Sequence, residues 1–140
     1  MPTTVGYSGT PLPRKLGITP GARLAVIGTP EGFRETLGEL PPGVEVRTRL
    51  SGRFDVIVAF FERRAVLECR LAALCGALDE AGGLWLAWPK RTSGLTTDLG
   101  DDVVRELGLA TGLVDNKVCA IDQTWSGLRF VYRRADRVRT

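Results

Sequence analysis

The stretch KRTSGLTTD, residues 90–98, holds the densest group of side chains in this sequence that could take part in chemistry. A cation such as Lys90 can attract an anion, and the hydroxyl groups of Ser93 and Thr96 can hydrogen-bond it. The stretch exceeds the usual strand-to-helix connection of about two to six residues, and long connections are often functional. We therefore predict that Lys90, Ser93 and Thr96 line a site for a small anionic ligand.

A structural interpretation of the same stretch stays open. Pro89 would end the preceding strand, Gly94 would form a turn, and Asp98 would cap a helix over about 99–108. In that case the polar side chains only connect two elements.

Missing residue types exclude several chemistries. The sequence contains no histidine, which excludes Ser-His-Asp triads, Cys-His dyads and histidine-based zinc or iron sites. Its three cysteines, Cys69, Cys75 and Cys119, form no CxxC pair, so we expect neither a disulfide framework nor a zinc site. We predict no catalytic residue, no metal site and no cofactor.

The overall composition is that of one globular domain. The 140 residues carry a net charge of +3, with 44% apolar and 25% charged residues. No run approaches the ~18–20 apolar residues of a membrane span, and no basic segment followed by an apolar core opens the chain. We therefore expect a cytoplasmic protein with no membrane contact. Arginines gather at the C-terminal end, at positions 129, 133, 134, 137 and 139.

Three continuous apolar runs predict the centre of a sheet. They lie at about 23–28, 54–61 and 84–88, and helical patterns separate them. Such strands are typical of parallel sheets that are covered on both faces. Two later runs, 114–121 and 127–134, predict an antiparallel hairpin at one edge. The order of elements therefore predicts an α/β fold with a mostly parallel sheet.

Capping residues predict the helix ends. Thr29 and Pro30 are of the types that begin a helix, which would run to about Leu40. A second helix is expected over 63–80, ended by the glycines in 81–83.

Residues 44–50 alternate between apolar and charged side chains, which is typical of a half-exposed edge strand. A parallel crossover from this strand to 54–60 would have only about four residues, and such crossovers usually need a dozen or more. Either an extended segment passes across the end of the sheet, which the edge pattern favours, or the two strands form a hairpin.

Several phrases resemble a known family. ITPGARLAVIG, RFDVIVAFF and LAALCGALDEAGGLWLAW resemble the first strand, the fourth strand and the following helix-Gly-Gly-strand unit of class I methyltransferases. ATGLVDNKVCAID and SGLRFVYRR are similar to that family's final antiparallel pair. The likeness implies a three-layer Rossmann-like fold over 18–134 in which the third strand and helix are missing. An N-terminal arm, 1–17, precedes this single domain, and a basic tail, 135–140, follows it.

A second likeness covers nearly the whole chain. GYSGTPLPRKLGI, WPK and TWSGLRFV together resemble short bacterial proteins grouped as a domain of unknown function. This likeness implies no activity.

The methyltransferase likeness places a cofactor turn at residues 28–32. Gly28 and Gly32 match its first and last glycines, and with Thr29 they are the candidate cofactor-binding residues. Pro30 stands in place of the middle glycine. The family's acidic residue after the second strand, which holds the ribose hydroxyls, is replaced by Thr48 and Arg49. We therefore expect S-adenosylmethionine to bind weakly or not at all.

Ligands of open α/β sheets bind beyond the carboxyl ends of the strands. Loops 28–32, 61–64 and 88–98 should meet there, so that Arg63 and Thr29 face Lys90, with Tyr7 of the arm contributing from a lid. The leading hypothesis is a non-catalytic methyltransferase-like domain that binds a small anionic ligand or a protein partner. The alternative is an S-adenosylmethionine-dependent methyltransferase with a degenerate cofactor turn. A third hypothesis is nucleic-acid binding through the C-terminal arginines.

Overall fold

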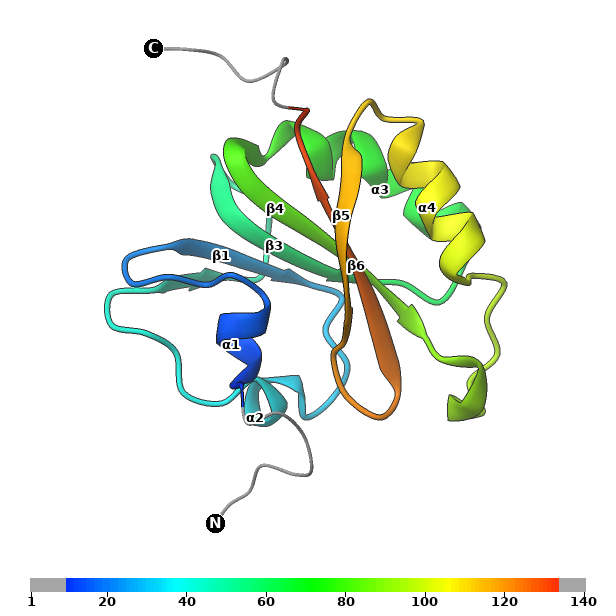
Figure 1. The fold of residues 1–140 in the computed structure, drawn as a ribbon, viewed down its shortest axis with the longest axis horizontal. Helices are drawn as coiled ribbons and strands as arrows, with labels where there is room; N and C mark the ends of the chain where they lie inside the picture. The colour runs from blue at the N-terminus through cyan, green and yellow to red at the C-terminus, as the bar shows by residue number, and fades with distance from the viewer. Residues whose placement is uncertain (1–9, 134–140) are drawn as a thin grey trace.

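The computed structural model describes residues 10–133, which form one six-stranded sheet with helices on both faces (Figure 1). The strand order is β2-β1-β3-β4-β6-β5, with β2, β1, β3 and β4 mutually parallel and β6 antiparallel to both of its neighbours. The fold is therefore α/β with a mostly parallel sheet and an antiparallel C-terminal hairpin, as predicted. The strands are β1 (Arg23–Ile27), β2 (Glu45–Arg47), β3 (Phe54–Phe60), β4 (Leu78–Pro89), β5 (Val114–Ala120) and β6 (Trp125–Val131).

The helices divide into two layers. Helices α1 (Leu12–Lys15) and α2 (Phe33–Leu37) pack on one face of the sheet, and α3 (Arg64–Gly76) and α4 (Asp101–Leu109) pack on the other. A short 3-10 helix, η1 (Arg91–Ser93), follows β4. Each face has its own apolar core, which gives the three layers that the sequence predicts.

The central strands are apolar at successive positions because each face of the sheet is covered. In β1, Leu24 and Val26 pack under α1 and α2, whereas Ala25 and Ile27 pack under α3. Burial of each of the larger side chains, Leu24, Val26 and Ile27, contributes about 1.5–3 kcal/mol of hydrophobic free energy. The three predicted apolar runs are therefore adjacent, parallel and buried, with β3 between β1 and β4.

The connection from β2 to β3 is an extended segment, and the hairpin alternative is wrong. Strand β2 pairs with β1 in parallel, and residues 48–53 pass over β1 to reach β3. Strands β2 and β3 lie about 10 Å apart across the sheet, and β3 begins about 10 Å back along it. Seven Cα steps of ~3.3–3.6 Å cover that diagonal of roughly 14 Å with slack. No helix is needed, which is how the fold omits one strand-helix unit.

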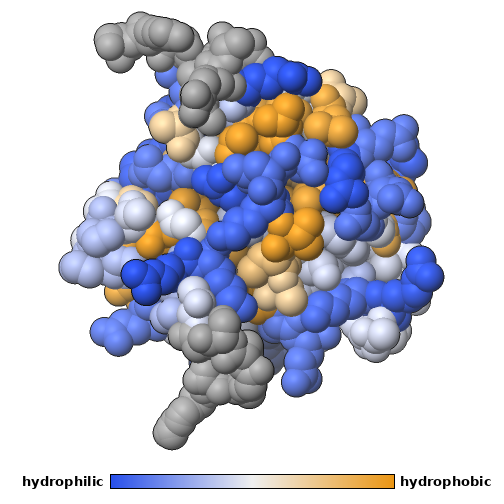
Figure 2. Space-filling model, viewed as in Figure 1, coloured by the Kyte–Doolittle hydropathy of each residue, from blue (hydrophilic) through white to orange (hydrophobic). Residues whose placement is uncertain are grey.

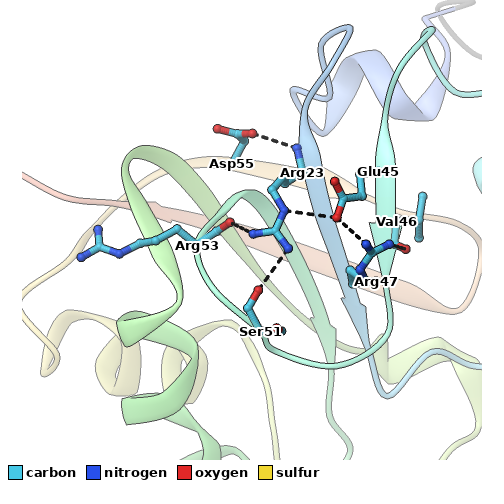
Figure 3. Close-up of polar contacts among 7 residues, drawn as sticks. All are labelled: Arg23, Glu45, Val46, Arg47, Ser51, Arg53 and Asp55. Carbon is cyan, nitrogen blue, oxygen red and sulfur yellow. Dashed lines mark hydrogen bonds and ion pairs between the residues drawn. The ribbon is translucent and has the colours of Figure 1, made fainter.

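Arg23 holds this crossover in place (Figure 3). Its guanidinium donates to the carbonyl oxygens of Arg53 (2.6 Å) and Ser51 (3.1 Å) and pairs with the Glu45 carboxylate (3.5 Å). Its backbone N–H donates to the Asp55 carboxylate at 2.8 Å. One side chain thus satisfies two carbonyl groups that no strand partner reaches.

Two predicted helix boundaries are wrong. Helix α2 begins at Phe33, with Gly32 as its N-cap, so Thr29 and Pro30 precede the helix instead of starting it. Helix α3 ends at Gly76, and residues 81–83 lie inside β4.

The physical reason for the second error is strand pairing. A Cβ atom on Gly82 would lie 2.6 Å from the carbonyl oxygen of Asp55. The glycine therefore permits close approach of β4 to β3, where the pairing is irregular, and does not cap a helix.

The residues just before the predicted domain pack into it. Leu16 is fully buried, and its carbonyl oxygen accepts a 3.0 Å hydrogen bond from the indole N–H of Trp85. Within 10–133, no helix has the length and apolar content that crossing a membrane requires. The molecular face seen in Figure 2 is mostly hydrophilic, with apolar residues emerging in separate patches.

Candidate ligand-binding site

A cavity of about 520 Å³ opens at the carboxyl edge of the sheet, between the ends of β1 and β3. The chain leaves β1 towards α2 on one face and leaves β3 towards α3 on the other, which makes this position a topological switch point. We call it the carboxyl-edge cavity. Its lining residues are Ile27, Gly28, Thr29, Pro30, Phe60, Phe61, Glu62, Arg63, Val66, Arg70 and Trp125.

The turn after β1 requires glycine for a reason internal to the fold. Gly28 has φ +65°, and a Cβ atom there would lie 2.9 Å from the carbonyl oxygen of Phe60. Gly32 has φ +83°, with no heavy atom within 4 Å of its Cβ position. Both conformations disfavour other residues, but only Gly28 is confined by a neighbouring strand.

Aromatic rings support the cavity. The rings of Phe60 and Trp125 meet edge to face, with centroids 5.2 Å apart, and Phe33 packs on Phe60 at 4.9 Å. The Asp122 carboxylate accepts hydrogen bonds from the backbone N–H groups of Thr124 and Trp125, each at 2.8 Å. The position of Trp125 is thereby fixed by both the turn and the ring contact.

Cations outnumber acids around the cavity. Arg63 and Arg70 are exposed and contribute two guanidinium groups, whereas Glu62 contributes the single carboxylate among the described residues of the lining. Arg63, Val66 and Arg70 are three and four residues apart, so they share one face of the α3 region. That spacing is visible in the sequence and could have predicted that Val66 and Arg70 line the cavity with Arg63, which was not predicted above. Phe60, Glu62 and Trp125 carry no comparable signal.

Two of the thiols, Cys75 and Cys119, are not activated as nucleophiles. Burial raises the pKa of Cys75, and a smaller effect of Thr111 lowers it. Burial also raises the pKa of Cys119, and the positive charges of Lys15, Lys117 and Lys90 oppose this shift. A raised thiol pKa disfavours the thiolate, which is the nucleophilic form. Within residues 10–133, no three carboxylate, thiol or imidazole groups gather as a metal site would need.

Much of the polar stretch 90–98 fixes the loop that follows β3. The Thr97 hydroxyl donates to the Glu62 carbonyl at 2.6 Å. The Asp98 carboxylate accepts a 2.7 Å hydrogen bond from the backbone N–H of Arg64, the first residue of α3. Asp98 thus caps the N-terminus of α3 through its side chain. The prediction that it caps the helix that follows it in the sequence is wrong. That helix, α4, begins at Asp101 with Gly100 as its N-cap.

The other predicted ligand-binding residues divide into two groups. Thr29 and Arg63 line the carboxyl-edge cavity, together with the candidate cofactor-turn residue Gly28. Lys90, Ser93 and Thr96 do not line it, although they follow the carboxyl end of β4 as expected.

Local contacts describe where these residues lie. The Lys90 backbone N–H donates to the Thr124 carbonyl at 2.7 Å, and the Ser93 hydroxyl accepts from the Leu95 N–H at 3.1 Å. Thr96 is exposed. Tyr7 lies outside the described residues.

A second, smaller groove of about 400 Å³ lies at the carboxyl end of β2. We call it the β2 groove; Arg47, Thr48, Arg49, Leu50 and Ser51 line it. It therefore includes Thr48 and Arg49, the two residues that the sequence likeness aligns with the ribose-binding acid of methyltransferases.

No protein-family model and no curated protein matches the chain. Solved structures do match its fold. The chain is similar to a SAM-dependent methyltransferase from Aquifex aeolicus, with TM-score 0.61 and 13% identity over 84% of this chain and 85% of that one. It is also similar to a ribosomal protein L11 methylase from Lactobacillus delbrueckii subsp. bulgaricus, with TM-score 0.58 and 12% identity over 88% and 75% of the two chains.

A third similar structure is the magnesium protoporphyrin IX methyltransferase from Synechocystis PCC 6803 with bound SAH, with TM-score 0.54 and 11% identity over 81% and 75% of the two chains. These identities establish the fold alone. The fold is therefore Rossmann-like and methyltransferase-like, as predicted. The likeness to short bacterial proteins stays a prediction.

Proposed function

We propose that this chain is a methyltransferase-like domain that transfers no methyl group and binds a small organic anion in the carboxyl-edge cavity. The observation that carries the proposal is the charge of the cavity: among the described residues that line it, two are arginines, Arg63 and Arg70, and one, Glu62, carries a carboxylate. Guanidinium groups form strong, often bidentate hydrogen bonds with carboxylates and phosphates. The apolar floor at Phe60 and Trp125 suits a flat apolar part of the same ligand.

The same charges oppose S-adenosylmethionine, whose methyl donor is a sulfonium cation. A cation about 5 Å from one guanidinium is repelled by about 1–3 kcal/mol for effective dielectric constants between 80 and 20. Pro30 lines the cavity where a methyltransferase would have glycine. Arg49 lines the β2 groove where a carboxylate would hold the ribose.

Proton transfer also lacks a suitable group. A general base needs a pKa near the working pH, which neighbours or burial usually provide. Among residues 10–133, Glu62 is the only carboxylate that lines the cavity, and it is exposed. The chain has no histidine to replace it.

Calorimetry with adenosine 5′-monophosphate tests the proposal, because this probe joins a flat base to a phosphate. We expect it to bind, and Arg63→Ala or Arg70→Ala to weaken binding at least about tenfold, or 1.4 kcal/mol. Arg91→Ala is the matched control, because it removes an exposed guanidinium that does not line the cavity.

S-adenosylmethionine is the competing probe in the same assay. Binding tighter than roughly 10 μM, about −7 kcal/mol, would support the methyltransferase alternative instead. No binding of the monophosphate, or equal binding by all three variants, would contradict the anion proposal.

A further inference from the structure

The β2 groove is a second concave surface with unbalanced positive charge. Two of its five lining residues are arginines, and two more, Thr48 and Ser51, carry hydroxyl groups. All five come from one short segment at the end of β2, so their spacing is fixed by the crossover that Arg23 holds.

Glu45 is the acid that contacts this group, and it is already engaged. Its carboxylate lies 2.6 Å from the Arg47 guanidinium and 3.5 Å from that of Arg23. Figure 3 shows Arg23 and Arg47 meeting at this carboxylate. Arg49 is exposed, and within residues 10–133 no side-chain hydrogen bond or ion pair engages its guanidinium. The groove therefore keeps one full guanidinium available for an anion.

The groove lies close to the carboxyl-edge cavity. Arg47 is in register with Ala25, two residues before the end of β1 at Ile27. The end of β2 is displaced from the end of β1 by two residues along the strand direction and by one strand spacing across the sheet. The two ends are therefore about 8 Å apart. A ligand of nucleotide size can span that distance.

The position of Arg49 indicates which part of a nucleotide would reach it. In Rossmann-like folds, the residue about 20 positions after the glycine turn contacts the ribose: an acid binds the hydroxyl groups, and an arginine accommodates a phosphate there. Arg49 follows Gly28 by 21 positions and lies at the carboxyl end of the second strand. The groove thus has the residue type that matches a phosphorylated ribose.

We propose that the β2 groove is a phosphate subsite, and that the chain binds a nucleotide with a phosphate on its ribose. The inference rests on the proposed function, because the base and the first phosphate occupy the carboxyl-edge cavity. The ribose phosphate accepts charge-assisted hydrogen bonds from the Arg49 guanidinium. The hydroxyl groups of Thr48 and Ser51 complete the contacts.

The experiment compares calorimetric affinities of the full chain for adenosine 5′-monophosphate and for its 2′,5′- and 3′,5′-bisphosphates. We expect at least one bisphosphate to bind tenfold or more tightly than the monophosphate. Arg49→Ala should abolish that gain and leave the monophosphate affinity unchanged. Arg53→Ala is the matched control, since Arg53 does not line the groove and its side chain points away from Arg47 and Ser51 in Figure 3. This variant should keep the gain.

The outcomes separate the two proposals. If the monophosphate binds through Arg63 and Arg70 but neither bisphosphate binds more tightly, the phosphate subsite is wrong and the anion site stands. A gain that survives Arg49→Ala also contradicts the subsite. A bisphosphate that binds through Arg49 while the monophosphate does not bind supports the subsite and contradicts the cavity proposal. A chain that binds none of the three probes contradicts both.

Discussion

Replacing Gly28 by alanine tests whether the turn after β1 is shaped by the fold or by a ligand. Alanine at φ +65° costs about 1–2 kcal/mol, because its Cβ crowds the following carbonyl in the left-handed region. The new Cβ would also lie 2.9 Å from the carbonyl oxygen of Phe60. That oxygen cannot retreat easily, since Phe60 is buried and pairs with Ala87 of β4.

The second contribution is therefore a packing cost, which is about 1–3 kcal/mol when atoms are forced into filled space. Gly28→Ala should lower the free energy of unfolding by about 2–5 kcal/mol in total. Gly32→Ala is the matched control within the same turn: its φ is +83°, but no heavy atom lies within 4 Å of its Cβ position. It should lower the free energy by only about 1–2 kcal/mol.

Urea unfolding of the parent and both variants, without added ligand, measures these differences from the midpoint at constant slope. The reasoning is refuted if Gly28→Ala is no more destabilising than Gly32→Ala. The strand contact would then not explain the glycine, and a ligand that approaches the turn would have to be sought.

Two further predictions concern contacts around α3 and α4. Gly108→Ala should lower the melting temperature, because a Cβ there would clash with the fully buried Phe130 ring. This overpacking outweighs the gain of about 1 kcal/mol in helix propensity. Gly76→Ala, with nothing within 4 Å, should raise the melting temperature, and equal shifts would contradict the difference. Asp98→Ala should lower the free energy of unfolding, measured with urea, by about 1 kcal/mol, because the N–H of Arg64 loses its acceptor. Asp98→Asn should recover at least half of this loss. Equal losses in the two variants would contradict a capping role.

The sequence predicted the buried strands, because burial requires their residues to be apolar. The strands β1, β3 and β4 contain continuous apolar runs because helices cover both faces of the sheet, so that successive side chains are buried. The end of α3 was not predictable in this way. Leu78 continues the apolar pattern of the helix, yet it pairs with Phe54 as the start of β4. Whether Leu78 continues the helix or begins a strand depends on β3, which is distant in the sequence. The local periodicity of apolar residues therefore cannot predict it.

For the candidate site, the sequence predicted the positions that follow from topology and missed those that depend on side-chain partners. Thr29 and Arg63 line the cavity because loops at the carboxyl ends of adjacent strands must meet. In the stretch 90–98, the types of Thr97 and Asp98 indicate hydrogen bonding but not the partner. Their partners are Glu62, in the loop after β3, and Arg64, the first residue of α3, which lie 35 and 34 positions earlier. Nothing in the local sequence distinguishes such a contact from a ligand contact.

The short crossover links the architecture to the surface at the end of β2. Because the chain must return to β3 through residues 48–53, it turns back immediately after Arg47 and cannot extend β2. Arg49 is consequently displayed at the edge of a groove instead of along a strand. In a fold with a full third strand-helix unit, the chain would lead away at this point. The same omission that makes the domain small therefore places Arg49, which has no side-chain partner within residues 10–133, near the carboxyl-edge cavity. The Arg49→Ala variant, assayed with the bisphosphates, tests whether that placement serves a ligand.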